Sequence, residues 1–203
     1  STGSTVAWSM PNRLNFLTIV PMFHCNGWCY PWTIPMLNGK TICLRNIDVK
    51  KIFELIDKYD VTHFGGAPIV LNMITGAPES DRKKLKHKVY VLTAGAPPPS
   101  IIFKKMKELG FEVMHVYGLT ETYGHVTQCA WNDGWNEYEE EKQNEIKARQ
   151  GVRYPNTEGV TIMDPETMKE VPKDGKTIGE IMIRGNVVMK GYFKDKSATD
   201  KAM

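Results

Sequence analysis

The chain has 203 residues, and 41% of them are hydrophobic, which is enough apolar material for one sizeable core. Its 26 basic and 23 acidic residues leave a formal net charge of +3, a balance that argues against a surface for nucleic acid. No run of residues approaches the roughly 18 consecutive apolar positions of a membrane-spanning helix, so we expect no membrane span.

The first half of the chain alternates between strand-like and helix-like segments. Runs rich in β-branched and apolar residues predict strands at 14–20, 40–44, 61–64, 89–93 and 111–117. Helical patterns fall between them: one begins after Asp48, which can cap it, one follows Pro68 and ends near Ile74, and one covers 99–109. These repeated strand–helix pairs predict an α/β fold with layers built on a parallel sheet.

The second half changes character after Thr127. Residues 131–150 are highly charged and predict an exposed loop followed by a solvated helix. From Gly159 onward, apolar and polar residues alternate around turns at 164–165 and 173–175, which predicts antiparallel strands of a small β subdomain. We therefore assign residues 1–150 to the layered α/β portion and residues 151–203 to the start of the β subdomain.

The cysteines and the scattered histidines form no recognisable metal pattern. Cys25 and Cys29 lie close to His24, but a zinc site needs four ligands in recognisable pairs, and no second pair is present. We expect free, mostly buried thiols at positions 25, 29, 43 and 129. Three histidines are expected to be ordinary core or solvated side chains: His63, His87 and His125.

Three loops after expected strands carry the residues best suited to bind a ligand. They are the segments 24–28 (HCNGW), 95–98 (GAPP) and 117–121 (YGLTE). In parallel α/β sheets, ligands gather where the carboxyl ends of the strands meet their loops. The three segments are therefore predicted to meet at one edge of the sheet.

The segment from Tyr117 to Thr122 carries the strongest chemical signal. The Thr120 hydroxyl can donate to a phosphate oxygen, and the Glu121 carboxylate can hold Mg²⁺. The simpler interpretation is a helix N-cap followed by an acid in the first turn. Gly118 permits close backbone approach to a ligand, and Tyr117 can stack on a flat base that lies against the turn at Gly95; an ordinary tight turn is the alternative there.

Six segments in one order resemble the adenylate-forming acyl-CoA synthetase family, also called acyl-activating enzymes. The segments are PMFHCNGW (21–28), TAGAPP (93–98), YGLTET (117–122), ARQGV (148–152), DPET (164–167), and GEIMIRG (179–185) running into MKGY (189–192). The first is similar to plant members that take short-chain, medium-chain or aromatic acids. The resemblance implies part of the large N-terminal domain of an adenylate-forming ligase, in which the β subdomain is a small barrel.

The resemblance also implies roles for individual residues. The catalytic set would be Thr120, Glu121 and His24, with Glu121 as the Mg²⁺ ligand. The ATP and AMP contacts would be Gly95, Ala96, Pro97, His115, Tyr117, Gly118 and Thr120, where His115 replaces the usual Gln or Asn at the adenine edge. The acid pocket would be formed by His24, Cys25, Trp28, Gln150 and Gly151.

The reaction implied by the family has two halves and requires ATP, Mg²⁺ and coenzyme A. A small carboxylic acid attacks the α-phosphate of ATP to give acyl-AMP and pyrophosphate, and the thiol of coenzyme A then displaces AMP. Such an enzyme would work inside the cell, in the cytosol or the peroxisome. The identity of the acid and of the acceptor thiol is not encoded in these segments.

The chain also departs from the family pattern. Residues 1–5 match only the first half of the phosphate loop, and no Pro-Lys-Gly follows. The Thr-Gly-Asp segment and the C-terminal lid domain with its catalytic Lys are absent, so we expect an internal part of a larger protein that does not complete the reaction alone. The alternatives are a sister adenylating enzyme with another acceptor and a non-catalytic product that binds partners. A Rossmann oxidoreductase is disfavoured because no Gly-x-Gly-x-x-Gly follows the first strand.

Overall fold

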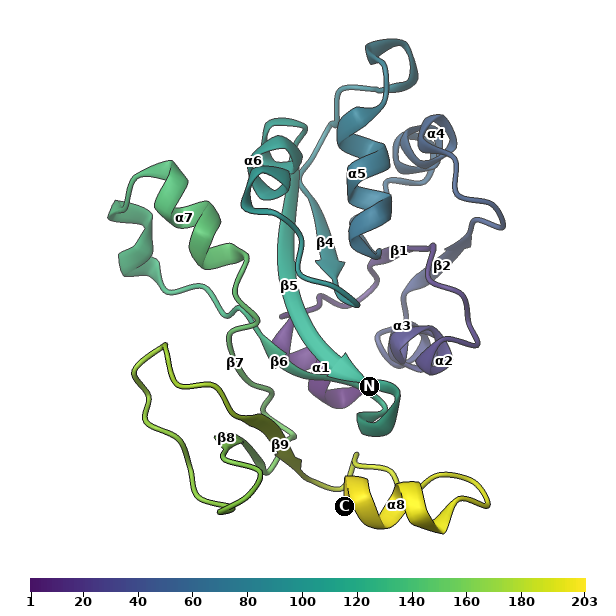
Figure 1. The fold of residues 1–203 in the computed structure, drawn as a ribbon. Coiled ribbons are helices and arrows are strands. Elements are labelled where there is room, and N and C mark those ends of the chain that lie inside the picture. The colour runs from purple at the N-terminus through teal and green to yellow at the C-terminus, as the bar shows by residue number, and fades with distance from the viewer.

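A seven-stranded sheet forms the centre of the computed structural model, which describes all residues from 1 to 203. Its strand order is β2-β1-β3-β4-β5-β6-β7, and the first five of these strands in chain order pair in parallel (Figure 1). β6 is antiparallel to β5, and β7 is antiparallel to β6. The strands are β1 (Asn15–Thr18), β2 (Lys40–Cys43), β3 (His63–Gly65), β4 (Val89–Thr93), β5 (Phe111–Leu119), β6 (Gly124–Gln128) and β7 (Val152–Arg153).

The helices connect and cover these strands. They are α1 (Thr2–Ala7), α2 (Cys25–Trp28), α3 (Tyr30–Met36), α4 (Val49–Tyr59), α5 (Pro68–Gly76), α6 (Ser100–Glu108), α7 (Glu140–Lys147) and α8 (Lys196–Ala202). Short 3-10 turns occur at 79–81, 120–122 and 133–137. The predicted cap of α4 is confirmed, because the Asp48 carboxylate accepts the backbone N–H of Lys51 at 2.8 Å. No helix has both the length and the apolar surface needed to cross a bilayer.

Each face of the sheet contributes to a separate hydrophobic core. On one face, α4, α5 and α6 pack on the strands in a cluster of 18 buried residues. On the other face, α1 and α3 border a cluster of 12 buried residues. Strand β4 supplies both clusters in alternation, since Val89 and Val91 belong to the first and Leu92 to the second. The α/β class with a largely parallel sheet, predicted from the sequence, is therefore confirmed.

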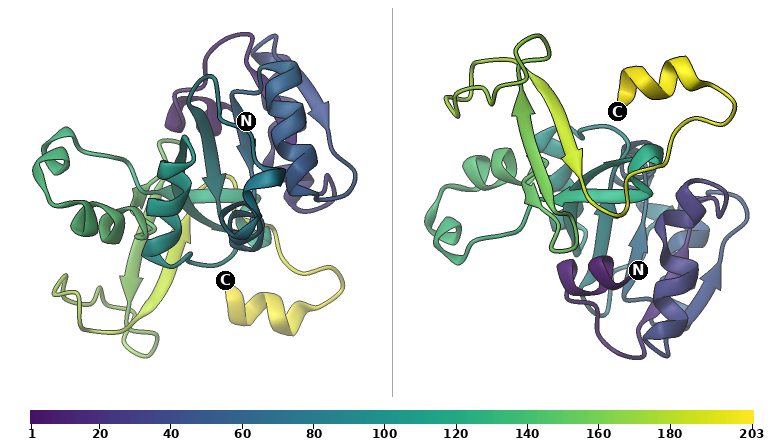
Figure 2. Two further views of the ribbon diagram at one scale, coloured as in Figure 1. Left: turned by 90° about the horizontal axis from the view of Figure 1, so that it is seen from above. Right: turned by 90° about the horizontal axis from the view of Figure 1, so that it is seen from below.

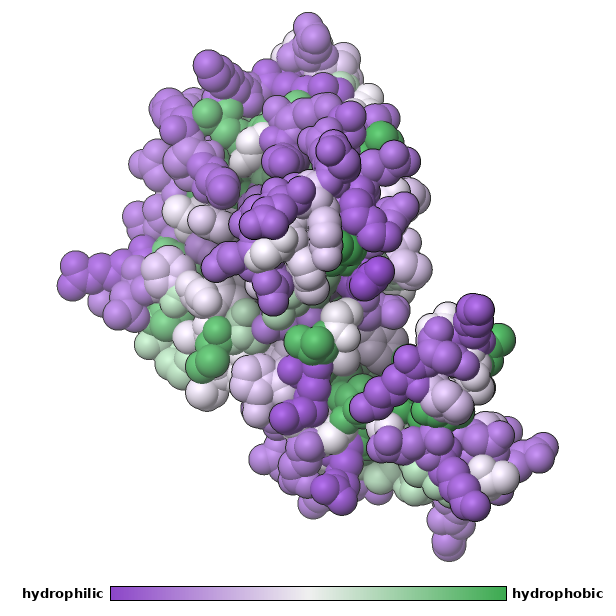
Figure 3. Space-filling model, turned by 90° about the vertical axis from the view of Figure 1, so that its left-hand side faces the viewer, coloured by the Kyte–Doolittle hydropathy of each residue, from purple (hydrophilic) through white to green (hydrophobic).

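The C-terminal part forms a small unit beside the large sheet. Strands β8 (Gly159–Met163) and β9 (Glu180–Arg184) pair with each other in antiparallel fashion, as predicted, and form a sheet of only two strands. Figure 2 shows this ribbon and α8 to one side of the main body, and Figure 3 shows them as a smaller, mostly hydrophilic lobe. The division at residue 150 stays a prediction, and β7 at 152–153 still pairs with the large sheet.

Several local features differ from the expectation. Residues 25–28, expected as a loop, form a left-handed turn, and α3 follows where no element was predicted. Strand β5 continues through Leu119, beyond its predicted end. The strand β6 was not predicted, because it is short and follows a tight turn at Tyr123 and Gly124. All four thiols are free, but only Cys29 and Cys129 are buried.

Candidate functional site

The three predicted segments meet at a hollow of about 230 Å³ at the carboxyl ends of β4 and β5. The hollow lies at the edge where parallel α/β sheets bind their ligands. It also includes residues that return from the β5–β6 hairpin. Its lining comprises His24, Cys25, Trp28, Ala94, Gly95, Gly118, Leu119, Thr120, Glu121, Gly124 and His125.

A tight hairpin holds Thr120 and Glu121 at its tip. The turn between β5 and β6 requires left-handed backbone at Tyr123 (φ 50°) and Gly124 (φ 109°). Gly118 faces the carbonyl of Gly124 so closely that any side chain at position 118 would overlap it. The glycine is thus needed for the hairpin itself, whether or not a ligand approaches it.

Thr120 does not cap a helix: the 3-10 turn at 120–122 has Leu119 at its N-cap position, although Glu121 does lie in the first turn, as the simpler interpretation has it. The hydroxyl of Thr122, not that of Thr120, closes the turn by accepting the N–H of Leu119 at 3.0 Å. The exposed Thr120 hydroxyl accepts only the thiol of Cys25, at 3.5 Å. It is therefore available as a donor to a ligand.

The Glu121 carboxylate faces no basic side chain within ion-pair distance. Its Oε1 atom accepts a hydrogen bond from the Tyr192 hydroxyl at 2.9 Å, and its backbone carbonyl accepts the N–H of Met189 at 2.7 Å. The hydrogen bond to Glu121 raises the pKa of the Tyr192 phenol. The carboxylate thus keeps an uncompensated negative charge at the edge of the hollow.

The donor set fits a cation that arrives with phosphates. No group of three or more His, Cys, Asp or Glu side chains gathers anywhere as a metal site. Mg²⁺ is commonly held by one or two carboxylates together with substrate phosphates and water. Glu121 is the only carboxylate in the hollow, and no Lys or Arg lines it. These residues suit Mg²⁺ bound with a nucleotide rather than a resident metal.

A left-handed turn brings the His24 segment to Thr120. Cys25, Asn26, Gly27 and Trp28 all have positive φ, between 43° and 59°, so α2 is not a regular right-handed helix. His24 lies exposed at the mouth of the hollow, while Trp28 is buried. Left-handed backbone at non-glycine residues costs about 1–2 kcal/mol each, so tertiary contacts must stabilise this turn.

Trp28 and His125 form an aromatic wall of the hollow. Their ring centroids are 5.3 Å apart, with an edge-to-face angle of 75°. The Nε2 atom of His125 is shielded from solvent and has no hydrogen-bond partner. Burial lowers the pKa of His125 to about 3, so the ring is neutral at pH 7. His125 was expected to be an ordinary histidine; the turn signal at Tyr123 and Gly124 is the feature that could have placed it here.

Other predicted residues do not line this hollow, and their roles stay predictions. His115 lies earlier on β5, where it is buried and its Nδ1 is 2.8 Å from the carbonyl of Ala148. Gly151 packs against the carbonyl of Gln128 at the end of β6 that points away from the hairpin tip. Four further predicted residues lie outside the lining: Ala96, Pro97, Tyr117 and Gln150.

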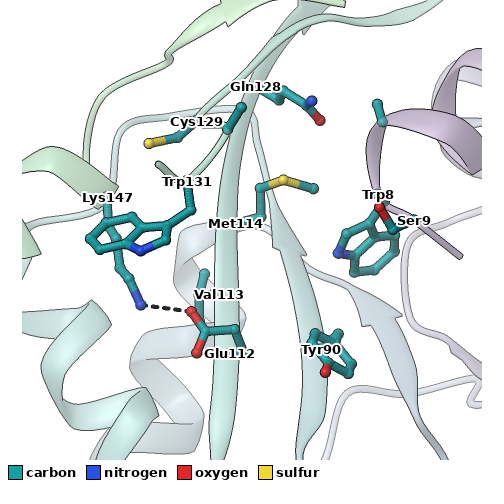
Figure 4. A pocket seen from close by; sticks show the side chains of 12 residues that line it. Trp8, Ser9, Tyr90, Glu112, Val113, Met114, Gln128, Cys129, Trp131 and Lys147 are labelled. Carbon is teal, nitrogen blue, oxygen red and sulfur yellow. Dashed lines mark hydrogen bonds and ion pairs between the residues drawn. The ribbon is translucent and has the colours of Figure 1, made fainter. Parts of the chain in front are cut away.

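A second hollow, of about 350 Å³, opens on the face of β4 and β5 and contains none of the predicted site residues. Figure 4 shows Glu112 and Lys147 joined across it, with a distance of 2.6 Å between Oε1 and Nζ. The ammonium group also lies 5.2 Å from the ring centroid of Trp131. Glu112 and Lys147 neutralise each other, whereas the Glu121 carboxylate in the first hollow has no basic partner and can bind a cation.

The chain is similar to known proteins over nearly its whole length. Residues 2–193 match the family described as AMP-binding enzyme. The chain is 51% identical over 193 residues to the peroxisomal acetate/butyrate–CoA ligase AAE7 of Arabidopsis thaliana, covering 94% of this chain and 34% of that protein. It is 49% identical over 204 residues to the acetate–CoA ligase CCL3 of Humulus lupulus, and the match covers 100% of this chain and 36% of that protein.

The likeness extends to solved structures. O-succinylbenzoate coenzyme A synthetase of Bacillus subtilis, in complex with ATP and magnesium ion, superimposes with a TM-score of 0.77 at 20% identity, covering 100% of this chain and 39% of that chain. This match shows the fold. The chain spans about a third of the length of the curated relatives it matches. A family match over residues 2–193 and relatives at about half identity show that the chain belongs to the family of AMP-binding enzymes.

Proposed function

We propose that this chain carries the part of an ATP-dependent acid–CoA ligase that binds ATP and a small carboxylic acid. The observation that carries the proposal is the meeting of Thr120, Glu121 and the His24 segment around one hollow. In the complete reaction, the acid would attack the α-phosphate of ATP to form acyl-AMP, and coenzyme A would then take the acyl group. The names of the two relatives, both CoA ligases, support this activity.

The residues at the hairpin tip would bind the phosphates of ATP and their Mg²⁺. Mg²⁺, when bound with ATP, supplies positive charge that neutralises the phosphate oxygens. Glu121 would hold it, because its carboxylate has no competing basic partner. Thr120 would donate its hydroxyl to a phosphate oxygen. The base of ATP would lie between Tyr117 and the turn at Gly95, with Ala96, Pro97 and His115 as further contacts.

The aromatic wall would receive the apolar end of the acid. Trp28 and the neutral ring of His125 offer a surface without charge, while exposed His24 at the mouth can hydrogen-bond the carboxyl group. The two relatives are named for acetate and butyrate and for acetate. We therefore favour short-chain acids over medium-chain or aromatic ones. The site of action would be the cytosol or the peroxisome.

Acid-dependent exchange of pyrophosphate into ATP tests the proposed reaction. The purified chain would be assayed with acetate, butyrate, octanoate and benzoate as probes. Because the residues found here supply only Thr120 and Glu121 to the phosphates, we expect exchange far below that of a full-length relative, highest with the short acids. Exchange at the rate of a full-length relative would contradict the expectation that further segments are needed.

Calorimetric binding of Mg²⁺–ATP tests the site independently of turnover. Glu121→Gln keeps the shape of the side chain but removes its charge, so we expect at least about tenfold weaker binding. Glu166→Gln is the matched control, because Glu166 is an exposed acid on the β8–β9 connection and its side chain makes no ion pair. Equal affinity in the two variants would refute the role of Glu121.

A further inference from the structure

The chain returns to the hairpin tip after β9 and holds Glu121 at two points. The backbone N–H of Met189 donates to the Glu121 carbonyl at 2.7 Å, and the Tyr192 hydroxyl donates to Oε1 at 2.9 Å. Both partners are distant from Glu121 in sequence, and Tyr192 is 71 residues away. Figure 1 shows the connection between β9 and α8 passing beneath the tip of the β5–β6 hairpin.

Tyr192 is held by a turn of its own, although 41% of the residue is exposed. Its backbone N–H donates to Oγ1 of Thr199 at 2.9 Å, and that hydroxyl donates to the carbonyl of Asp195 at 2.7 Å. Asp195 also caps α8 by accepting the N–H of Ala198 at 2.9 Å. A Cβ at Gly191 would lie 2.6 Å from Cγ2 of Thr199, so the chain can approach this closely only through a glycine.

We propose that Tyr192 is a positioning residue for Glu121, fixing the carboxylate so that its second oxygen, Oε2, is presented to the cation that accompanies ATP. This inference rests on the proposed function, because it assigns Glu121 to the metal. Tyr192 does not line the hollow and therefore acts through the carboxylate rather than on a ligand.

The chemistry of the contact supports this role. A carboxylate that accepts one hydrogen bond from a fixed donor loses rotational freedom and keeps lone pairs for a metal. Residues that orient a metal ligand in this way typically contribute about 10–100-fold to metal affinity.

Tyr192→Phe tests the inference, because it removes only the hydroxyl. Mn²⁺ binding in the presence of ATP, followed by the loss of its free electron-spin-resonance signal, measures the cation site without turnover. We expect about tenfold weaker Mn²⁺ binding with an unchanged melting temperature. Tyr123→Phe is the control, since Tyr123 lies on the same hairpin and its hydroxyl makes no hydrogen bond to Glu121. Unchanged or tighter Mn²⁺ binding in Tyr192→Phe would overturn the proposal.

A double variant separates this inference from the proposed function. In a Glu121→Gln background, Tyr192→Phe should have no further effect on Mn²⁺ affinity, and an added loss would show that Tyr192 does not act through Glu121. If Glu121→Gln alone leaves Mn²⁺ binding intact, the proposed function itself fails. Thr199→Val is a second test, because it loosens the turn that holds Tyr192 but keeps the phenol. We expect it to lower Mn²⁺ affinity by less than Tyr192→Phe does.

Discussion

Truncating Trp28 should destabilise the protein far more than truncating its neighbour Trp32. Trp28 is 6% exposed, so almost the whole of its side chain is removed from water. A large aromatic side chain buries on the order of 200 Å², which at about 25 cal/mol per Å² amounts to roughly 5 kcal/mol. Measured costs of truncating buried aromatics to alanine are about 3–5 kcal/mol. We therefore expect Trp28→Ala to lower the free energy of unfolding by about 4 kcal/mol.

Trp32 provides a matched control on the neighbouring helix α3. It is 55% exposed, so less than half of its area is buried, and Trp32→Ala should cost below about 2 kcal/mol. Urea unfolding followed by far-ultraviolet circular dichroism measures both variants without relying on tryptophan fluorescence. If Trp28→Ala costs no more than Trp32→Ala, the packing of Trp28 against His125 does not stabilise the left-handed turn, and the reasoning fails.

Two further predictions concern charge. Burial lowers the pKa values of His63 and His125 from 6.5 to about 4 and about 3, so protons bind preferentially to the unfolded chain. The free energy of unfolding should therefore be greatest above pH 6.5 and fall as the pH drops toward 4, with a loss by pH 5 of up to about 2 kcal/mol for each histidine in urea titrations; a flat profile would contradict the burial. Lys147→Met leaves half-buried Glu112 without its partner and should cost about 1–3 kcal/mol, whereas the exposed control Lys142→Met should cost about 0.5 kcal/mol or less; equal costs would refute the distinction.

Local signals were sufficient where a segment's own residues determine its structure. The apolar run 89–93 was predicted as a buried parallel strand, and β4 lies between β3 and β5 in that arrangement. Helix α4 begins where Asp48 can cap it, and three of its apolar residues are buried on one face: Ile52, Phe53 and Ile56. In both segments, burial follows the spacing of the apolar residues.

Local signals failed between Cys25 and Met36. Helix α3 was not predicted, and it forms because Pro31 lies in its first turn and Tyr30 and Ile34 are buried in the second core. The left-handed turn before it has no sequence signal beyond Gly27, since its stability comes from contacts made by Trp28 with a strand about a hundred residues later. Tertiary packing therefore overrides propensity in this segment.

In the candidate site, too, some residues could be predicted from local signals and others depend on tertiary structure. His24, Gly95 and Glu121 could be predicted to meet because they follow parallel strands whose carboxyl ends share one edge. Gly151 could not be placed, because it depends on β6 running antiparallel and ending far from the hairpin tip. The direction of β6 also explains why His125, at its beginning, enters the hollow.

Glu121 is consequently supported by parts of the chain that the sheet does not connect. The hairpin tip is fixed by β5 and β6, whereas the contacts from Met189 and Tyr192 come from the β9–α8 connection, which lies beside the main body. Loss of those contacts removes no residue from either hydrophobic core. The position of the carboxylate can therefore change while the sheet remains folded, so cation affinity is a more sensitive measure of the C-terminal unit than the melting temperature.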